Sequence, residues 1–570
     1  RMLRAWIGAP LRELGATHAR HDGVEALLGE PRLRAELASR LRDIRDVVRL
    51  AARARLGTAS PRELGALRSS LQALPGIATL LAEISARRTD HAMPELLGLG
   101  DDLCEDLRAV LEASLVDEPP SHTRDGGMIR DQADRELDRQ RALRDGGREA
   151  LAAIEARERE RTGINNLKVQ HNRVFGYFLE VPRAQQAKVP ADYVRKQTLV
   201  NAERYVTAEL AEHETAVLGA LAAALTREQE LFVALRQQVS VAAERLCQLG
   251  ERLATLDVLV GLAEIAEQGG YVRPEMVDEA ILEIEEGRHP VVERMMESGR
   301  FVPNSLSLRA GGGEGEGQAA RFLLVTGPNM GGKSTVMRQV ALIAVLAHAG
   351  AFVPAARARV GLVDRVFTRV GAADDLGRGE STFMVEMRET AQILSQASPR
   401  SLVLLDEIGR GTATFDGLAL AWSITEFIHD QIGCRALFAT HYHELTGLPE
   451  RLAGLKNVHV AVHEERGHIV FLHRLEDGPA ERSYGIQVGR LAGLPAPVLR
   501  RAQRILARLE ADDRVGKGPQ LELFSPLTPE EADAAERPRT AGEIVVNGGH
   551  GNGHGNGNGN GNGHAHVSPT

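Results

Sequence analysis

The sequence predicts a multidomain protein with an α-helical core, long lever helices, a small β-rich insert, a C-terminal α/β P-loop domain and a disordered tail. Three observations lead to this fold class. Strand patterns are nearly absent from the first 160 residues, a short aromatic and basic β pattern interrupts the helices, and a glycine-rich phosphate motif lies at residues 327–335. With 570 residues, 43% of them hydrophobic, the chain can build several cores.

Residues 1–161 are predicted to form a helical core and a first lever. Leu33, Leu37 and Leu41 recur at the spacing of one helix face, and similar patterns continue through the region. Dense, alternating charge over residues 133–161 predicts a long exposed helix, and a solvated face is the simplest role for those charges.

Residues 162–206 change character. Residues 167–181 predict a β-hairpin with Gly176 near its turn. The whole region contains seven basic and three acidic residues. Such an insert suits contacts with the DNA backbone, although a small folded insert with ordinary surface lysines has the same composition. The candidate DNA-binding residues are Lys168, Arg173, Arg195, Lys196 and Arg204.

Residues 207–268 return to a helical pattern and are predicted to be the returning lever helices. A helix that leads out, an inserted module and a helix that leads back would place that module at the tip of the levers. The nucleotide domain is predicted over residues 269–480, because strands and helices alternate there around the glycine-rich motif.

The glycine-rich motif has the form of a P-loop, lying between a short β-favouring run at 321–326 and a helical pattern at 334–349. Backbone amides of such a loop cradle phosphates, Lys333 would reach the β- and γ-phosphates, and Ser334 would hold Mg²⁺. The predicted ATP-binding residues of the loop are Gly327, Pro328, Asn329, Met330, Gly331, Gly332, Lys333, Ser334 and Thr335.

Two acidic residues follow a hydrophobic strand pattern at residues 401–405. Asp406 would hold Mg²⁺, and Glu407 would orient or deprotonate the attacking water. His441 follows another strand pattern and would lie beside the γ-phosphate, an assignment that depends on the family pattern described below.

Composition excludes several classes of protein. The formal charge of −9 means that DNA contacts must come from a local basic face. Cys104, Cys247 and Cys434 are far apart and are predicted to be buried thiols of a reducing compartment. The longest apolar run, residues 340–353, is too short to span a membrane, so we predict a cytoplasmic protein with no membrane partner.

Several long motifs resemble the MutS family of DNA mismatch-repair proteins, and the resemblance covers roughly residues 1–510. The ATPase motifs lie at residues 327–335, 368–376, 381–387, 406–412 and 439–445, and shorter matches lie at residues 1–6 and 195–205. The family match implies an ABC-type ATPase that works as a homodimer with ATP and Mg²⁺, a DNA clamp at residues 162–206, and a helical dimerisation segment at residues 481–510.

The resemblance also implies roles for single residues. Ser381 would approach the γ-phosphate of the other subunit, Phe301 would stack on adenine and His473 would cover its other face. ATP binding would close the dimer and move the clamps on double-stranded DNA, and a MutL-type protein would receive the signal. A nucleoid-associated location follows from that role.

The sequence departs from the family pattern in two places. Ala413 stands where the family usually has Ser, which removes one hydroxyl from the loop after Glu407. The mismatch-reading and connector domains of the family are not recognisable, and the start at Arg1 is interpreted as an N-terminal truncation. We therefore expect binding of DNA and ATP with poor reading of mismatches, and we treat the Phe178-Leu-Glu180 pattern as coincidental.

Residues 511–570 are predicted to form a disordered tail, because a Gly/Asn/His repeat cannot bury a core. Within this tail Gln520, Leu521, Glu522, Leu523 and Phe524 resemble the motif with which bacterial repair proteins bind the DNA sliding clamp. Two alternatives remain, namely a MutS relative that holds branched DNA and a non-enzymatic DNA-binding scaffold.

Overall fold

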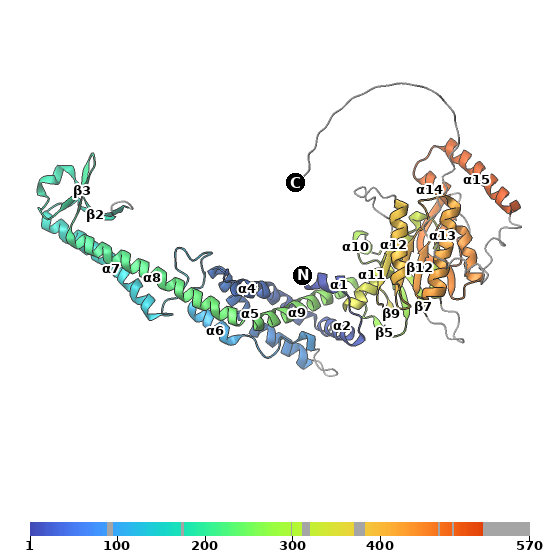
Figure 1. The fold of residues 1–570 in the computed structure, drawn as a ribbon, viewed down its shortest axis with the longest axis horizontal. Helices are drawn as coiled ribbons and strands as arrows, with labels where there is room; N and C mark the ends of the chain where they lie inside the picture. Colours follow the sequence, from blue (N-terminus) through green and yellow to red (C-terminus); the bar gives the residue numbers. More distant parts are fainter. Residues whose placement is uncertain are drawn as a thin grey trace, which may run out of the picture. The chain divides into compact units, whose positions relative to one another are not determined.

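The computed structural model describes residues 1–87, 95–172, 176–297, 299–310, 320–369, 382–465, 468–480 and 484–516. Contacts divide the chain into two compact units, Arg1–Gly485 and Ile486–Thr570, and each is considered by itself. The described part of the chain is rich in helices and contains three sheets, in agreement with the predicted multidomain class (Figure 1).

A helical body forms the first part of the larger unit. Leu33, Leu37 and Leu41 are all buried in its core, as their helical spacing predicts. A late helix, α9, completes the same core, so the body is closed by residues far apart in the sequence. Its helices are α1 (Met2–Gly8), α2 (Leu14–Leu28), α3 (Pro31–Asp43), α4 (Val47–Arg55), α5 (Pro61–Arg87), η1 (Glu95–Leu97), α6 (Glu105–Ser114) and α9 (Ala243–Gly269).

Two long helices, α7 (Arg135–Thr162) and α8 (Ala208–Val241), run side by side as the levers (Figure 1). The side chain of Asp134 caps α7 by accepting a hydrogen bond from Leu137, and Thr207 caps α8 in the same way from Leu210. Gly163, in the left-handed conformation, ends α7. Local sequence therefore sets where each lever begins.

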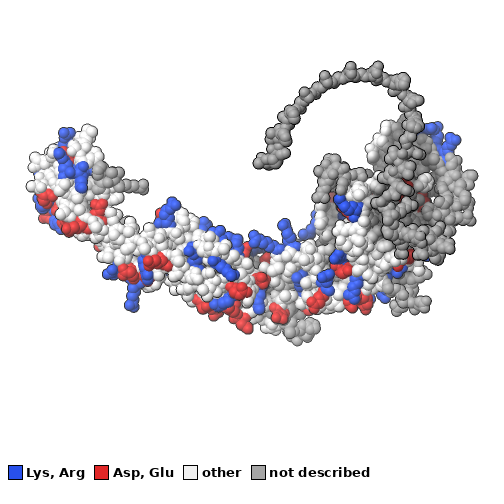
Figure 2. Space-filling view, viewed as in Figure 1, with Lys and Arg blue, Asp and Glu red and all other residues white. Residues whose placement is uncertain are grey.

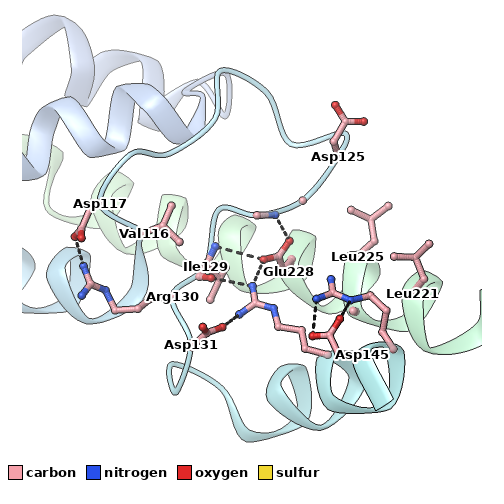
Figure 3. Close-up of a pocket in the computed structure, with 15 residues that line it drawn as sticks. Val116, Asp117, Asp125, Ile129, Arg130, Asp131, Asp145, Leu221, Leu225 and Glu228 are labelled. Carbon is pink, nitrogen blue, oxygen red and sulfur yellow. Dashed lines mark hydrogen bonds and ion pairs between the residues drawn. The ribbon is translucent and has the colours of Figure 1, made fainter. Parts of the chain in front are cut away.

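The base of the levers is held by a buried ionic cluster (Figure 3). Glu228 of α8 accepts hydrogen bonds from Arg141 of α7 and, at 2.7 Å, from the backbone N–H of Gly127. Arg141 also contacts the exposed Asp131 at 2.6 Å. Because Glu228 keeps only 5% of its side chain exposed, this carboxylate joins both levers to the preceding loop out of water.

The chain between the levers forms a four-stranded antiparallel sheet in the order β1-β2-β4-β3, here called the sheet module. The predicted hairpin is present, and Gly176 has a φ of +73° at its turn. Leu179, Val181 and Tyr205 are buried in an apolar cluster that the module shares with the ends of α7 and α8. Its elements are β1 (Lys168–Asn172), β2 (Gly176–Pro182), η2 (Arg183–Lys188), β3 (Val194–Thr198) and β4 (Ala202–Val206).

A six-stranded sheet in the order β10-β11-β12-β8-β13-β14 organises the domain that follows. Only β14 runs antiparallel to its neighbour, and apolar clusters cover both faces of the sheet. Its elements are β8 (Phe322–Thr326), η3 (Asn329–Gly331), α11 (Lys333–Ala349), β10 (Val366–Arg369), α12 (Thr382–Gln396), β11 (Leu402–Asp406), α13 (Thr414–Phe427), η4 (Ile428–Ile432), β12 (Arg435–Ala439), η5 (His443–Glu450), β13 (Leu455–Glu465) and β14 (His468–Asp477).

A second sheet, in the order β5-β9-β6-β7, lies beside the first and was not expected from the sequence. Arg435 of β12 is fully buried and donates hydrogen bonds to the carbonyls of Ile281 at 2.8 Å and Leu362 at 2.9 Å, so it links the two sheets. The elements are β5 (Glu275–Val277), β6 (Ile281–Gly287), α10 (Val292–Met295), β7 (Asn304–Arg309) and β9 (Arg357–Gly361).

The last helices are α14 (Gly485–Leu491) and α15 (Ala496–Gly516), so helix continues past the predicted end at residue 510. The three cysteines are free thiols, but Cys247 is half-buried, not buried as predicted, because it lies at the edge of the body's core. In the described part of the chain, no helix combines the length and apolar character needed to cross a membrane.

Candidate functional site

The P-loop lies between the carboxyl end of β8 and the amino end of α11, as the sequence predicts. Gly327 has a φ of +117° and Gly332 a φ of +103°, conformations that favour glycine. A Cβ on Gly331 would come within 3.0 Å of Val460 on β13. The loop is therefore shaped to bring its backbone N–H groups, and the positive end of the helix dipole, to an anion.

Lys333 is the first residue of α11 and is only 1% exposed. Its ammonium group donates a hydrogen bond to the carbonyl of Gly327 and lies 3.7 Å from Oε1 of Glu407. Burial lowers the pKa of Lys333, while Glu407 and Asp406 act in the opposite direction. The two neighbouring carboxylates thus favour the charged form of this buried lysine.

Asp406 and Glu407 lie at the carboxyl end of β11, which pairs with β12, and β12 in turn pairs with β8. The Oδ1 atom of Asp406 is buried, and no group in the described ranges hydrogen-bonds it. An unpaired buried carboxylate oxygen is a ligand suited to Mg²⁺, and Ser334, the second residue of α11, is the hydroxyl that the P-loop motif offers as another. No group of three or more His, Cys, Asp and Glu side chains with metal-ligand geometry occurs among the described residues.

Besides Lys333, a backbone hydrogen bond and an arginine fix the position of Glu407. It has a φ of +58°, unusual for a residue with a side chain, and its backbone N–H donates to the carbonyl of Ala439 at 2.8 Å. Arg410 contacts its Oε2 at 2.5 Å. Sequence reasoning gave Arg410 no role, although a cation three residues after the acid was a signal for such a pair.

His441 follows β12 and packs against Tyr442, with 4.2 Å between ring centroids. Burial, together with the nearby cations Arg410 and Lys333, lowers its pKa to about 4. The imidazole is therefore neutral near pH 7 and sits in the same cluster as the P-loop lysine.

The loop after Glu407 is fixed by hydrogen bonds to two other elements. Glu386 of α12 accepts a hydrogen bond from the backbone N–H of Gly409 at 2.6 Å, and the Tyr442 hydroxyl donates to the Gly409 carbonyl at 2.9 Å. Ala413 is the N-cap residue of α13, and no side-chain hydrogen bond caps this helix. The departure from the family pattern therefore leaves a helix end without the cap that a serine would supply.

The predicted adenine side is built from β7 and β14. His473 has a φ of +53°, and its Nδ1 lies 2.9 Å from the Gly331 carbonyl of the P-loop. Asn304 donates to the His473 carbonyl at 2.9 Å and accepts from Leu475 at 2.7 Å. Because Phe301 precedes Asn304 by three residues, the structure brings its segment to the same edge of the loop as His473.

The sheet module presents part of the predicted basic set to solvent. Lys168, Arg195 and Lys196 are exposed, and Figure 2 shows Lys and Arg gathered on the part of the module around β3. Arg204 is different. It bonds Glu180 at 3.2 Å, lies over the Phe178 ring at 4.3 Å and keeps 17% of its side chain exposed. It therefore stabilises the sheet, and its assignment as a DNA contact loses support.

The buried position of Phe178 agrees with the view that the Phe178-Leu-Glu180 pattern is coincidental, because a wedge residue would need to reach a base stack. Several predicted residues lie outside the described part of the chain, namely Ser381, Arg173 and Gln520 to Phe524. The side chain of Asn329 is likewise not described.

Two family profiles match this chain. The one described as MutS domain III matches residues 1–263, and the one described as MutS domain V matches residues 323–510. The proteins named DNA mismatch repair protein MutS from Symbiobacterium thermophilum and from Synechococcus sp. are 51% and 49% identical to it, over 90% and 91% of its length. The chain spans 57% of the length of each of these two relatives.

Proposed function

Because the chain belongs to the MutS family, we propose that it is an ATP-dependent DNA-binding protein of DNA mismatch repair. It would hydrolyse ATP and use the nucleotide to gate its hold on double-stranded DNA. The observation that carries the proposal is the position of Lys333, the first residue of α11 after the P-loop, 3.7 Å from Glu407, which follows Asp406 at the carboxyl end of β11 in the same parallel sheet.

The nucleotide would bind with its phosphates at the amino end of α11. Lys333 would contact the β- and γ-phosphates, while Phe301 and His473 would flank the adenine ring. Ser334 and Asp406 would hold Mg²⁺, which when bound offsets phosphate charge. Glu407 would orient the attacking water and take its proton, and neutral His441 would hydrogen-bond near the γ-phosphate.

The active assembly is proposed to be an ABC-type homodimer, in which Ser381 of the partner subunit completes each site. A MutL-type protein would receive the ATP-dependent signal, and residues 520–524 would bind a DNA sliding clamp. These partners imply a cytoplasmic, nucleoid-associated protein. Lys168, Arg195 and Lys196 are the exposed residues that we propose contact DNA phosphates, a contact that carries no sequence information.

The proposal is tested by binding of the chain to matched, mismatched and four-way-junction DNA at two salt concentrations, with and without Mg·ATP. Salt-sensitive duplex binding that ATP weakens, together with ATP hydrolysis, is the expected result. A strong preference for the junction would favour the relative that holds branched DNA. DNA binding without any ATP hydrolysis would favour the non-enzymatic scaffold.

A further inference from the structure

The two ends of the P-loop helix α11 face different parts of the protein. Its amino end lies at the P-loop, and its carboxyl end is hydrogen-bonded to the helical body. Its last four carbonyls belong to Leu346, Ala347, His348 and Ala349, which have no partners within the helix itself. The turn that ends α11 satisfies the first two through the backbone N–H groups of Ala351 and Gly350. The last two are satisfied by the helical body.

The body supplies one backbone and one side-chain donor. The N–H of Leu11 donates to the His348 carbonyl at 3.0 Å, and the guanidinium of Arg20 donates to the Ala349 carbonyl at 2.9 Å. Arg20 lies on α2, 329 residues away in the sequence from the residue it binds. Its positive charge stands at the negative end of the same helix dipole whose positive end faces the phosphate site.

Arg20 is held rigidly in this position. Its guanidinium stacks 3.5 Å from the ring centroid of Trp6, which is 7% exposed. Gly350 has a φ of +87°, and a Cβ there would lie 2.3 Å from the Cβ of Arg20. Only a glycine at that position allows this close approach of the α11 end to α2.

Helix α2 leads directly to the levers. It packs along α9, where a Cβ on Gly23 would lie 3.0 Å from Leu259. Helix α9 follows α8 after the single residue Ala242, and α8 contacts β2 of the sheet module. A continuous set of packed helices thus runs from the phosphate loop through α11, α2 and α9 to the basic sheet.

We propose that Arg20 is a positioning residue that couples the P-loop helix to the levers. When phosphates bind at the amino end of α11, the helix moves with them, and Arg20 passes this movement to α2 and α9. The inference deepens the proposed function and rests on it, because it names the contact through which nucleotide would change the hold on DNA.

The test compares Arg20→Met, which keeps the length of the side chain but removes its bonds, with Arg20→Lys, which restores the charge. Arg273→Met is the matched control. Arg273 pairs with Asp22 and Glu25 of the same α2 helix, and among the described residues neither of these ion pairs involves α11.

The first readout is hydrogen–deuterium exchange of α2 and α9 when Mg·ATP is added. The parent is expected to show a nucleotide-dependent change there, and Arg20→Met to lose at least four-fifths of it. Arg20→Lys should recover part of the change, and Arg273→Met should keep it. DNA-free ATP turnover should stay within twofold of the parent in all three variants.

No nucleotide-dependent change in parental α2 and α9, or an equal change in Arg20→Met, would overturn the inference. An equal loss in Arg273→Met would also overturn it, since any bond to α2 would then suffice. The second readout, ATP-induced release of labelled duplex, separates the two proposals. If the exchange change reaches α9 in the parent but ATP never releases DNA, the coupling through Arg20 holds. The proposed gating of DNA by ATP would then fail.

Discussion

Lys333 in the nucleotide site is 1% exposed, whereas Arg195 in the sheet module keeps 59% of its side chain in solvent. The buried lysine is fixed by a carbonyl and two carboxylates, so its geometry is set before any ligand arrives. The charge of the exposed arginine is screened by water and salt. Its proposed contribution to DNA affinity would depend on how many phosphates it contacts. Buried charges therefore determine chemistry here, and exposed charges determine affinity.

The largest effect is expected at the half-buried carboxylate of Glu407 in the proposed nucleotide site. Glu407→Gln should lower the turnover number for ATP by about 10²–10⁴-fold, because the amide cannot accept the proton of water. The KM for ATP should change little, since Lys333 and the P-loop remain. Steady-state phosphate release measures both values, with Glu285→Gln, an exposed acid of the same domain, as control. Parental turnover in Glu407→Gln would contradict the assigned role.

The lever base tests the same contrast within one cluster. Glu228→Ala should destabilise the larger unit by about 3–5 kcal/mol. The reason is that Arg141, which is largely buried, would lose its buried ion-pair partner. Asp131, the exposed ion-pair partner of Arg141, keeps 86% of its side chain in solvent. Asp131→Ala should therefore cost only about 0–1 kcal/mol. Urea denaturation followed by circular dichroism compares the two, and equal shifts in midpoint would argue against the importance of burial.

A buried histidine should make stability depend on pH. His21 is fully buried at 0% exposure, and burial lowers its pKa from 6.5 to about 4. The unfolded chain then binds a proton that the folded chain does not, so this contribution is complete above pH 6.5 and is lost as the pH falls towards 4. The loss should reach about 2 kcal/mol at pH 5. His21→Phe should lose less stability between pH 7 and pH 5 than the parent in urea denaturation.

Exposed charges of the sheet module should affect DNA affinity and leave catalysis unchanged. Arg195→Glu combined with Lys196→Glu should weaken DNA binding on the order of tenfold and lower the slope of log K against log salt by about 2. ATP turnover without DNA should match the parent. Lys188→Glu, near Gly163 at the lever end of the module, is the matched charge reversal. Equal losses in both variants would remove the assignment of a specific face.

The smallest effect is expected at the uncapped end of α13. Ala413→Ser should stabilise the protein by about 0.5–2 kcal/mol, because the hydroxyl can accept a hydrogen bond from the first turn. A rise in the thermal midpoint of the nucleotide domain measures it, with Ala397→Ser outside any helix start as control. No rise would mean that the loop cannot adopt the cap geometry.

The P-loop and its flanking elements were predictable because their residues are close in sequence and obey strict local geometry. Gly327 and Gly332 mark conformations that only glycine favours, and the strand and helix patterns on either side give Lys333 its place. The levers also show local signals: dense, alternating charge predicts a helix over residues 133–161, a helical pattern covers residues 207–268, and Asp134 and Thr207 cap the two helices that form. Each of these features is encoded within about one or two turns of chain.

Only the tertiary structure decided which distant residues meet. Arg410 beside Glu407, Arg204 folded against Phe178, and Arg20 on the Ala349 carbonyl each look like ordinary surface arginines in the sequence. An arginine leaves the same local signal in the sequence whether it faces solvent, a carboxylate or a carbonyl. Its role therefore follows from the packing around it. The sequence by itself determined the nucleotide motif and the helical levers, and the fold determined which charges are buried and what they join.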